Sequence, residues 1–215
     1  MKRLAAVLGW PIGHSRSPAM HDAAFAACGI DAVMLPLAVP PARLADAVRG
    51  LAAVDALGAS VTVPHKEAAL AACADRDASA RAVVVGLEGL GAEVVVVARR
   101  PDAVTWRAAA PWAELPALLP TAALLVDATS AALDPTTDAA LAAAVPLAAL
   151  PADATVATLI YHRATALLAA ARARGHATID GRAMLLYQAT RAFTLWTGRA
   201  APVDVMAAAL ASSLG

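Results

Sequence analysis

The sequence is poor in the residues that mark secreted, metal-binding and nucleic-acid-binding proteins. Among its 215 residues it has two cysteines, Cys28 and Cys73, and 4% aromatic residues. The cysteines fall in predicted helices without the spacing of metal ligands, and the five histidines do not cluster, so we expect reduced thiols and no metal. Lysine plus arginine equals aspartate plus glutamate at 17 each, so no basic face for nucleic acid is implied.

Long hydrophobic runs are also missing, although 60% of the residues are hydrophobic. Alanine supplies much of that fraction, and no apolar stretch reaches the roughly 20 residues that cross a bilayer. The first nine residues, MKRLAAVLG, have a basic pair followed by an apolar run, as a signal peptide does. Pro11 and the serines after it fit a folded domain better. We therefore expect a cytoplasmic enzyme of one or two domains, with small-molecule partners and no membrane.

The most informative feature is the octet SVTVPHKE at residues 60–67. Alternating β-branched residues predict a strand that Pro64 ends, and a helical pattern follows. This places Thr62 and Lys66 at the carboxyl end of a strand, where open α/β sheets bind ligands. A lysine at such a junction is also often a solvated surface residue, so the octet alone leaves both interpretations open.

A second polar segment, GWPIGHSRSP at residues 9–18, follows another apolar strand. Ser15 and Ser17 are two apart, so both hydroxyls can face one side of an extended turn. Pro18 predicts a helix start with Ser17 as its N-cap, and a capping role alone would explain one serine but not the pair. Two hydroxyls and a lysine at neighbouring strand ends suit a small polyhydroxy ligand with a carboxylate.

A third segment, DGRAMLLYQATRAFTLWTG at residues 180–198, has apolar residues at helical spacing with Gln188 among them. Together, the three segments resemble the shikimate dehydrogenase family, whose patterns read N-P-I-x-H-S-x-S-P, N-V-T-x-P-x-K and D-G-x-x-M-L-x-x-Q-A. Weaker matches are VDATSAALDP at 126–135 and ATLIYHRATALLAAARARG at 157–175. The matches occur in the family's order and run almost from end to end.

The resemblance implies a reversible hydride transfer between NADP and the ring ketone of 3-dehydroshikimate, with Lys66 as the catalytic proton-transfer residue. The residues implied in substrate binding are Ser15, Ser17, Thr62, Lys66, Tyr161 and Gln188. Those implied in cofactor binding are Arg99, Arg100, Thr129, Leu159, Gly181 and Met184. The arginine pair follows a strand at the position where the family recognises the 2′-phosphate of NADP.

The sequence departs from the family after Asp77. The family continues there with an N-T-D-G motif, the first strand of the nucleotide domain and a glycine-rich turn, G-x-G-G-A. This chain passes directly into VVGLEGLGAEVVVVARR, so several dozen residues look absent around residues 79–83, and a smaller gap is possible after Arg100. Either the deletion is real or the sequence as written omits a segment that the protein holds.

Three glycines near this junction do not replace the missing turn. Gly86, Gly89 and Gly91 have the spacing G-x-x-G-x-G, the wrong order for a dinucleotide fingerprint. Too few residues separate Gly91 from the next strand, at residues 94–97, to form the helix that the fingerprint needs. We expect Gly91 to end a helix that begins near Ala78.

Alternating strand and helix patterns predict an α/β fold. We expect a substrate-binding domain at residues 1–78 and 182–215, and a Rossmann-like NADP domain at 79–181 that lacks its first strand and glycine-rich turn. The last two helices return to the first domain, and the substrate would lie between the two. The predicted strands are residues 4–8, 32–39, 58–63, 94–98, 123–127 and 155–159. The predicted helices are residues 19–28, 42–51, 67–74, 114–119, 139–145, 164–174, 183–197 and 202–210.

The hypothesis is an NADP-linked shikimate dehydrogenase, as a monomer or a homodimer. One alternative is a catalytically inactive remnant that binds shikimate. Another is a quinate or shikimate dehydrogenase that uses NAD, which the arginine pair disfavours.

Overall fold

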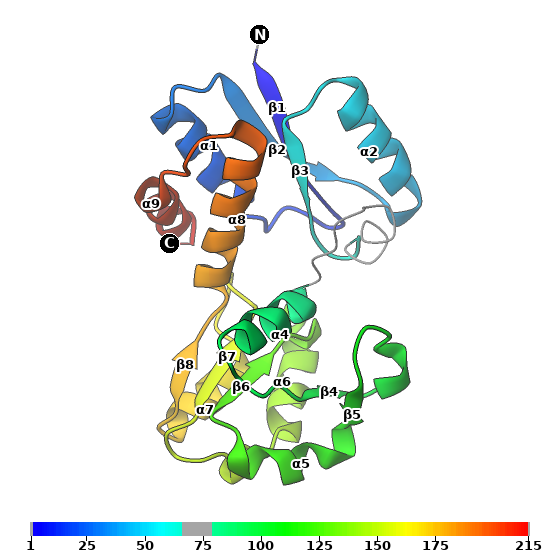
Figure 1. Cartoon of the computed structure of the whole chain (residues 1–215), viewed down its shortest axis with the longest axis vertical. Coiled ribbons are helices and arrows are strands. Elements are labelled where there is room, and N and C mark those ends of the chain that lie inside the picture. Colours follow the sequence, from blue (N-terminus) through cyan, green and yellow to red (C-terminus); the bar gives the residue numbers. More distant parts are fainter. Residues whose placement is uncertain (1, 66–78, 215) are drawn as a thin grey trace. The chain divides into compact units, whose positions relative to one another are not determined.

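The computed structural model describes residues 2–65 and 79–214, and the chain forms two compact units (Figure 1). Unit 1 comprises Met1–Ala78 and Ala183–Gly215, and unit 2 comprises Ser79–Arg182. The C-terminal helices thus belong to the same unit as the N-terminal strands, which confirms that element of the predicted fold. The predicted helix at residues 67–74 and the catalytic assignment to Lys66 lie outside the described residues.

Unit 1 is built on a parallel sheet in which β1 (Arg3–Gly9) lies between β2 (Ala32–Ala38) and β3 (Gly58–Val61). Ala5, Ala6, Val7 and Leu8 of β1 are almost fully buried, as expected for a central strand covered on both faces. The helices are α1 (Ser17–Ala27), α2 (Leu44–Ala53), α8 (Arg182–Thr197) and α9 (Val203–Leu214).

The two faces of this sheet are covered by different helices. Leu44 of α2 joins a buried cluster with Ala6 and Leu8, so α2 packs on the face to which these two residues point. On the other side α1 packs against α9 and β2, and aromatic side chains of α8 meet α1. Figure 1 shows α1, α8 and α9 grouped together, away from α2.

The start of α1 corrects one sequence prediction. The N-cap is Arg16, and Ser17 is already inside the helix, with Pro18 beside it in the first turn. The Oγ of Ser15 accepts the backbone N–H of Ser17 at 3.4 Å. The serine pair is therefore linked directly, and it is the hydroxyl of Ser15, not that of Ser17, that serves the helix start.

Unit 2 contains two separate parallel sheets. One has the order β6 (Leu124–Asp127), β7 (Thr155–Thr158), β8 (Ala177–Ile179), and the other pairs β4 (Val96–Ala98) with β5 (Ala109–Pro111). The helices are α4 (Ser79–Gly89), α5 (Leu115–Leu118), α6 (Pro135–Ala144) and α7 (Ala166–Ala173). Val97 of β4 and Leu125 of β6 pack against the same buried cluster, so both sheets share one core.

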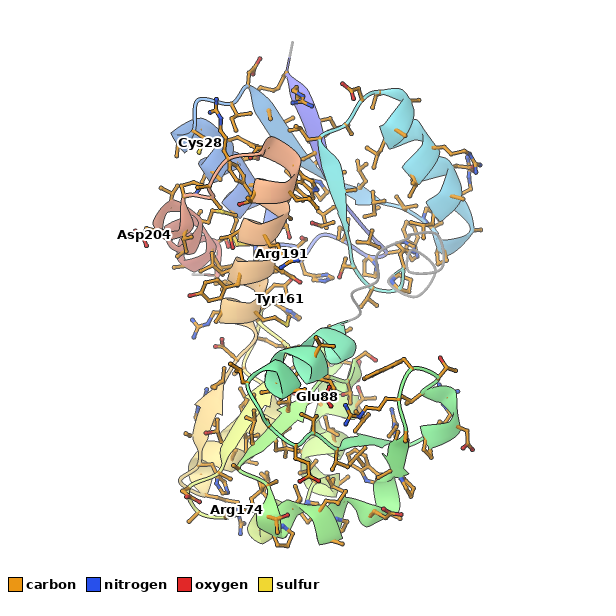
Figure 2. The ribbon with its side chains drawn as sticks, in the orientation of Figure 1. Cys28, Glu88, Tyr161, Arg174, Arg191 and Asp204 are labelled. Atoms are coloured by element: carbon orange, nitrogen blue, oxygen red, sulfur yellow. The ribbon has the colours of Figure 1, made fainter. Side chains whose placement is uncertain are left out.

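The prediction for Gly91 is confirmed. Helix α4 ends at Gly89, and Gly91 adopts φ +84°, the left-handed conformation that glycine accepts most readily. Glu88, labelled in Figure 2, forms an ion pair with Arg107, whose guanidinium also donates to the carbonyl oxygen of Val94 at 2.8 Å. The three glycines thus belong to a helix and its end.

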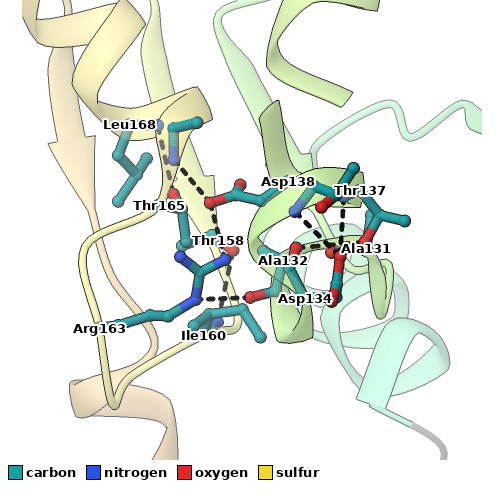
Figure 3. A network of polar contacts seen from close by, with 12 residues as sticks. Ala131, Ala132, Asp134, Thr137, Asp138, Thr158, Ile160, Arg163, Thr165 and Leu168 are labelled. Carbon is teal, nitrogen blue, oxygen red and sulfur yellow. Dashed lines mark hydrogen bonds and ion pairs between the residues drawn. The ribbon is translucent and has the colours of Figure 1, made fainter. Parts of the chain in front are cut away.

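A polar network joins α6 and α7 in unit 2 (Figure 3). Asp134 caps α6 by accepting the backbone N–H groups of Thr136 and Thr137, so this helix begins four residues before the predicted start. The buried carboxylate of Asp138 accepts from the guanidinium of Arg163 at 2.8 Å and from the backbone N–H of Ala166 at 2.9 Å. These contacts tie the loop after β7 to α6.

Candidate functional site

The carboxyl ends of β1 and β3 bring two of the predicted substrate segments together in unit 1. The backbone N–H of Trp10 donates to the carbonyl of Val63 at 3.1 Å, and that of Thr62 donates to Leu8 at 2.9 Å. These bonds extend the pairing of the two strands beyond their ends, so the loop with Ser15 starts beside Thr62. The sequence prediction of neighbouring strand ends agrees with this arrangement.

Gly9 allows the two segments to pack closely. A Cβ atom at this position would lie 2.6 Å from Cγ2 of Thr62 and 2.7 Å from Cδ1 of Ile12. Thr62 is half-buried against this loop, Ser15 is half-buried and Ser17 is 8% exposed. The three side chains are therefore at least partly shielded from water.

His65 fixes the backbone immediately before Lys66, a role that the sequence analysis missed. Its ring is buried, with Nε2 2.7 Å from the carbonyl oxygen of Val39, and its backbone N–H donates to the carbonyl of Thr62 at 2.9 Å. The turn that follows β3 is thus tied to Val39, the residue directly after β2. In the sequence, the one indication of this role is that His65 directly precedes Lys66 in the octet SVTVPHKE.

Gln188 is exposed on α8, and no contact links it to Ser15, Ser17 or Thr62 in the described parts of unit 1. Trp196 of the same helix packs directly on Gly58, where a Cβ would lie 2.2 Å from Nε1 of the indole. Helix α8 runs opposite to β3 (Figure 1), so the part of α8 before Trp196 extends toward the carboxyl end of β3.

In unit 2 the carboxyl ends of β6 and β7 meet around the buried carboxylate of Asp127. Its oxygens accept the backbone N–H of Thr129 at 2.9 Å and the hydroxyl of Thr158 at 3.4 Å. The carbonyl of Asp127 also accepts the N–H of Leu159 at 3.2 Å. Two predicted cofactor residues, Thr129 and Leu159, are thus positioned by one residue that the sequence analysis did not single out.

Gly181 lies against the same strand end. Its N–H donates to the carbonyl of Ile160 at 2.9 Å, and a Cβ at this position would lie only 2.1 Å from the carbonyl oxygen of Leu159. The structure therefore brings Leu159 and Gly181 into contact, and only glycine fits there. Tyr161 follows Ile160 in the loop after β7 and is labelled in Figure 2. It is half-buried, and its ring lies edge-on to that of His162.

The remaining predicted cofactor residues are less closely grouped. Arg99 and Arg100 directly follow β4, both exposed, and neither side chain has a hydrogen-bond partner in the described part of unit 2. Met184 is half-buried on α8 in unit 1. Free guanidinium groups at a strand's carboxyl end suit recognition of a phosphate by parallel hydrogen bonds.

Neither a metal-type cluster nor a membrane span is found among the described residues. Within residues 2–65 and 79–214, no three histidine, cysteine, aspartate or glutamate side chains gather closely enough to hold a metal ion. None of the helices in that part of the chain combines the length and the apolar character that a membrane span requires.

Comparisons with known proteins place both ends of the chain in one family. Residues 7–85 match the shikimate dehydrogenase substrate binding domain, and residues 181–211 match the shikimate 5′-dehydrogenase C-terminal domain. The NADP(+) shikimate dehydrogenase of Gluconobacter oxydans is 32% identical over 254 residues, with 91% of this chain and 90% of that protein covered. That of Thermosynechococcus vestitus is 33% identical over 275 residues, with 99% and 96% covered.

A solved structure shares the fold. Shikimate 5-dehydrogenase of Thermus thermophilus, crystallised with NADP(H) and shikimate, superposes with a TM-score of 0.75 at 23% identity and covers 99% of this chain and 100% of that one. An alignment of 275 residues cannot be filled by a chain of 215, so several dozen positions of the relatives have no counterpart here. The relatives thus support the internal gap that the motifs predict.

Proposed function

Because the chain belongs to the shikimate dehydrogenase family, we propose that it catalyses the reversible NADPH-dependent reduction of 3-dehydroshikimate to shikimate. The observation that carries the proposal is the packing of Gly9, where the loop that carries Ser15 and Ser17 begins, against Thr62 at the carboxyl edge of unit 1. We assign the substrate to this unit and NADP to unit 2. The reaction would serve the shikimate pathway of aromatic amino acid biosynthesis, in the cytoplasm, by a monomer or a homodimer.

The residues of unit 1 suit a polyhydroxy acid. The hydroxyls of Ser15 and Ser17 can donate to a carboxylate, and that of Thr62 can bind a ring hydroxyl. We assign proton transfer at the ring oxygen to Lys66, because an alkoxide that forms there needs a proton donor or a cation nearby. His65 would act as a positioning residue, since it holds the turn that precedes this lysine.

The residues of unit 2 fit part of the cofactor. Arg99 and Arg100 are suited to the 2′-phosphate, and the close packing of Gly181 on the backbone of Leu159 holds these two predicted cofactor residues together. When bound, NADPH supplies the hydride, and the protein's part is to orient it. The family's glycine-rich turn, which would hold the pyrophosphate, has no counterpart in this sequence.

That gap favours a second candidate function, a unit that binds shikimate without hydride transfer. The observation behind it is the division of unit 2 into two sheets, which leaves the nucleotide fold without a continuous central sheet. One experiment separates the candidates: titration of the purified chain with shikimate by calorimetry, beside an absorbance assay at 340 nm with shikimate and NADP.

Saturable shikimate binding with NADPH formation supports the dehydrogenase. Binding without turnover supports the second candidate, and absence of both would contradict the assignment of unit 1. The same assay with NAD and with quinate tests cofactor and substrate preference.

A further inference from the structure

The parallel sheet of unit 2 is interrupted at one place, between β4 and β6. Val97 and Leu125 pack on one buried cluster, yet their strands belong to separate sheets. In doubly wound nucleotide folds the strand order is 3-2-1-4-5-6, so the first strand lies between the second and the fourth. If β4 is the second strand and β6 the fourth, the interruption lies where the first strand belongs.

The edge of β6 toward this interruption is open. On the side of β7, the carbonyls of Ala123 and Asp127 accept the N–H groups of Thr155 and Leu159, at 3.0 and 3.2 Å. Because backbone groups of successive strand residues point to opposite sides, those of Leu124 and Val126 face away from β7. Within the described residues, neither makes a hydrogen bond in that direction.

Burial agrees with an open position. Residues Val156–Thr158 of β7, which has a strand on each side, are at most 9% exposed. Leu124 of β6 is 36% exposed, the next two residues of that strand are half-buried, and every residue of β4 is half-buried. Both edges therefore have the apolar, incompletely covered character of strands that lack a neighbour.

We propose that unit 2 accepts, between β4 and β6 and parallel to both, an extended apolar strand supplied by a separate polypeptide. The proposal rests on the family assignment behind the proposed function, since the relatives hold several dozen residues for which this chain has no counterpart. A second copy of the chain lacks the same strand, so the occupant is a different molecule. A strand with neighbours on both sides is covered on both faces, so the occupant has consecutive β-branched and apolar residues.

A synthetic peptide tests this directly. The probe is fluorescein-labelled Lys-Lys-Val-Val-Val-Leu-Gly-Ala-Gly-Gly-Ala, an apolar strand followed by a glycine-rich turn, titrated with the full chain and followed by anisotropy. We expect saturable binding and slower hydrogen exchange at residues 94–98 and 123–127. The same peptide with proline as its second valine should not bind, because proline cannot complete the ladder.

Two protein variants locate the site. Val126→Pro removes the N–H that faces the open edge and should weaken peptide binding at least tenfold. The matched control, Ala38→Pro, places proline on the free edge of β2 in unit 1, where Pro36 already stands, and should leave binding unchanged. Circular dichroism and shikimate titration verify that both variants fold.

Several outcomes overturn the proposal: no saturable binding, binding that Val126→Pro or the proline peptide leaves unaffected, or a dimer of the chain that itself protects both edges and blocks the peptide. The assay uses neither shikimate nor NADP. An inactive chain that binds the peptide therefore leaves this inference standing, whereas an active chain that ignores the peptide overturns it alone.

Discussion

The methyl group of Thr62 occupies the space that a side chain at Gly9 would need. Their separation, 2.6 Å from Cγ2 to a Cβ built on the glycine, is far below van der Waals contact. The last residue of β1 and the residue after β3 are therefore packed together only because one of them has no side chain. This contact holds the start of the loop that carries Ser15 and Ser17 beside Thr62.

Replacing Gly9 by alanine should disturb both stability and binding. The added methyl group must displace Thr62 or Ile12, and such overpacking costs about 1–3 kcal/mol of unfolding free energy. We also expect weaker shikimate binding, because the two polar segments would move apart. Urea unfolding and calorimetric titration measure the two effects.

Gly13→Ala is the matched control for this change. Gly13 lies in the same loop, and no atom lies within 4 Å of a Cβ built there. Its unfolding midpoint and shikimate affinity should remain near those of the parent chain. If the two alanine variants behave alike, the close packing of Gly9 and Thr62 has no role in the site.

His21 is a buried base in an aromatic cluster of unit 1. Its ring is fully buried, with its centroid 4.9 Å from that of Trp196 and 6.0 Å from that of Phe25. Neither ring nitrogen has a hydrogen-bond partner among the described residues. Burial lowers the pKa of His21 to about 4, from the ordinary value of 6.5.

This shift predicts a loss of stability in mild acid. Between pH 6.5 and 4 the unfolded chain binds a proton at residue 21 that the folded chain does not, so stability is complete above pH 6.5 and falls below it. At pH 5 the loss from this residue should be about 2 kcal/mol. His21→Phe keeps an aromatic ring and removes the proton site.

Urea unfolding of both chains at pH 7.5 and pH 5 measures the difference. The phenylalanine variant should lose less stability on acidification, and His65 and His176 remain in both chains as a common background. An equal loss in the two chains would show that His21 does not titrate in this range.

The ion pair of Arg163 and Asp138 should stabilise unit 2 more than an exposed pair does. The carboxylate is 3% exposed, and the guanidinium donates to it at 2.8 Å (Figure 3). Arg163→Met would leave a buried carboxylate with only one N–H donor, at a cost of about 2–4 kcal/mol. Thermal and urea unfolding give the value.

An exposed ion pair provides the comparison. Arg43 and Asp46 lie 2.7 Å apart on the surface of unit 1, and Arg43→Met should change stability far less than Arg163→Met, because water screens the exposed pair. Equal effects at the two sites would mean that solvent reaches Asp138 and that burial does not strengthen its pair.

Local patterns were sufficient to predict most elements of both units. Apolar strands such as Leu4–Leu8 and helices ended by Gly29 or Gly91 lie within a few residues of their predicted positions, because alternation and glycine signals act over short distances. The prediction of Ser17 as the N-cap of α1 was wrong by a similarly small amount, because the N-cap is Arg16, one residue earlier. The segments with Ser15 and Thr62 likewise follow strand ends, as expected, whereas Lys66 lies outside the described residues.

Contacts between distant residues could not be predicted in this way. His65 meets Val39 across 26 positions, and Asp127 meets Thr158 across 31, so no periodicity relates the partners. The burial of His21 depends in the same way on α8, which lies far along the chain. The sequence predicted the loss of a strand after Asp77, but its consequence, two sheets over one core, required the structure.

The last prediction concerns Arg99, at the end of β4. If its guanidinium binds the 2′-phosphate, Arg99→Ala should weaken NADPH binding about 10–100-fold, because hydrogen bonds between charged groups contribute about 1.5–3 kcal/mol. NADH lacks that phosphate, so its affinity should change less than about threefold. Arg174→Ala is the matched control, since Arg174 is an exposed arginine of unit 2 (Figure 2) that follows α7, away from β4. Titration by nucleotide fluorescence measures the affinity of each variant for NADPH and for NADH. If Arg99→Ala weakened the binding of both nucleotides equally, Arg99 would not recognise the 2′-phosphate.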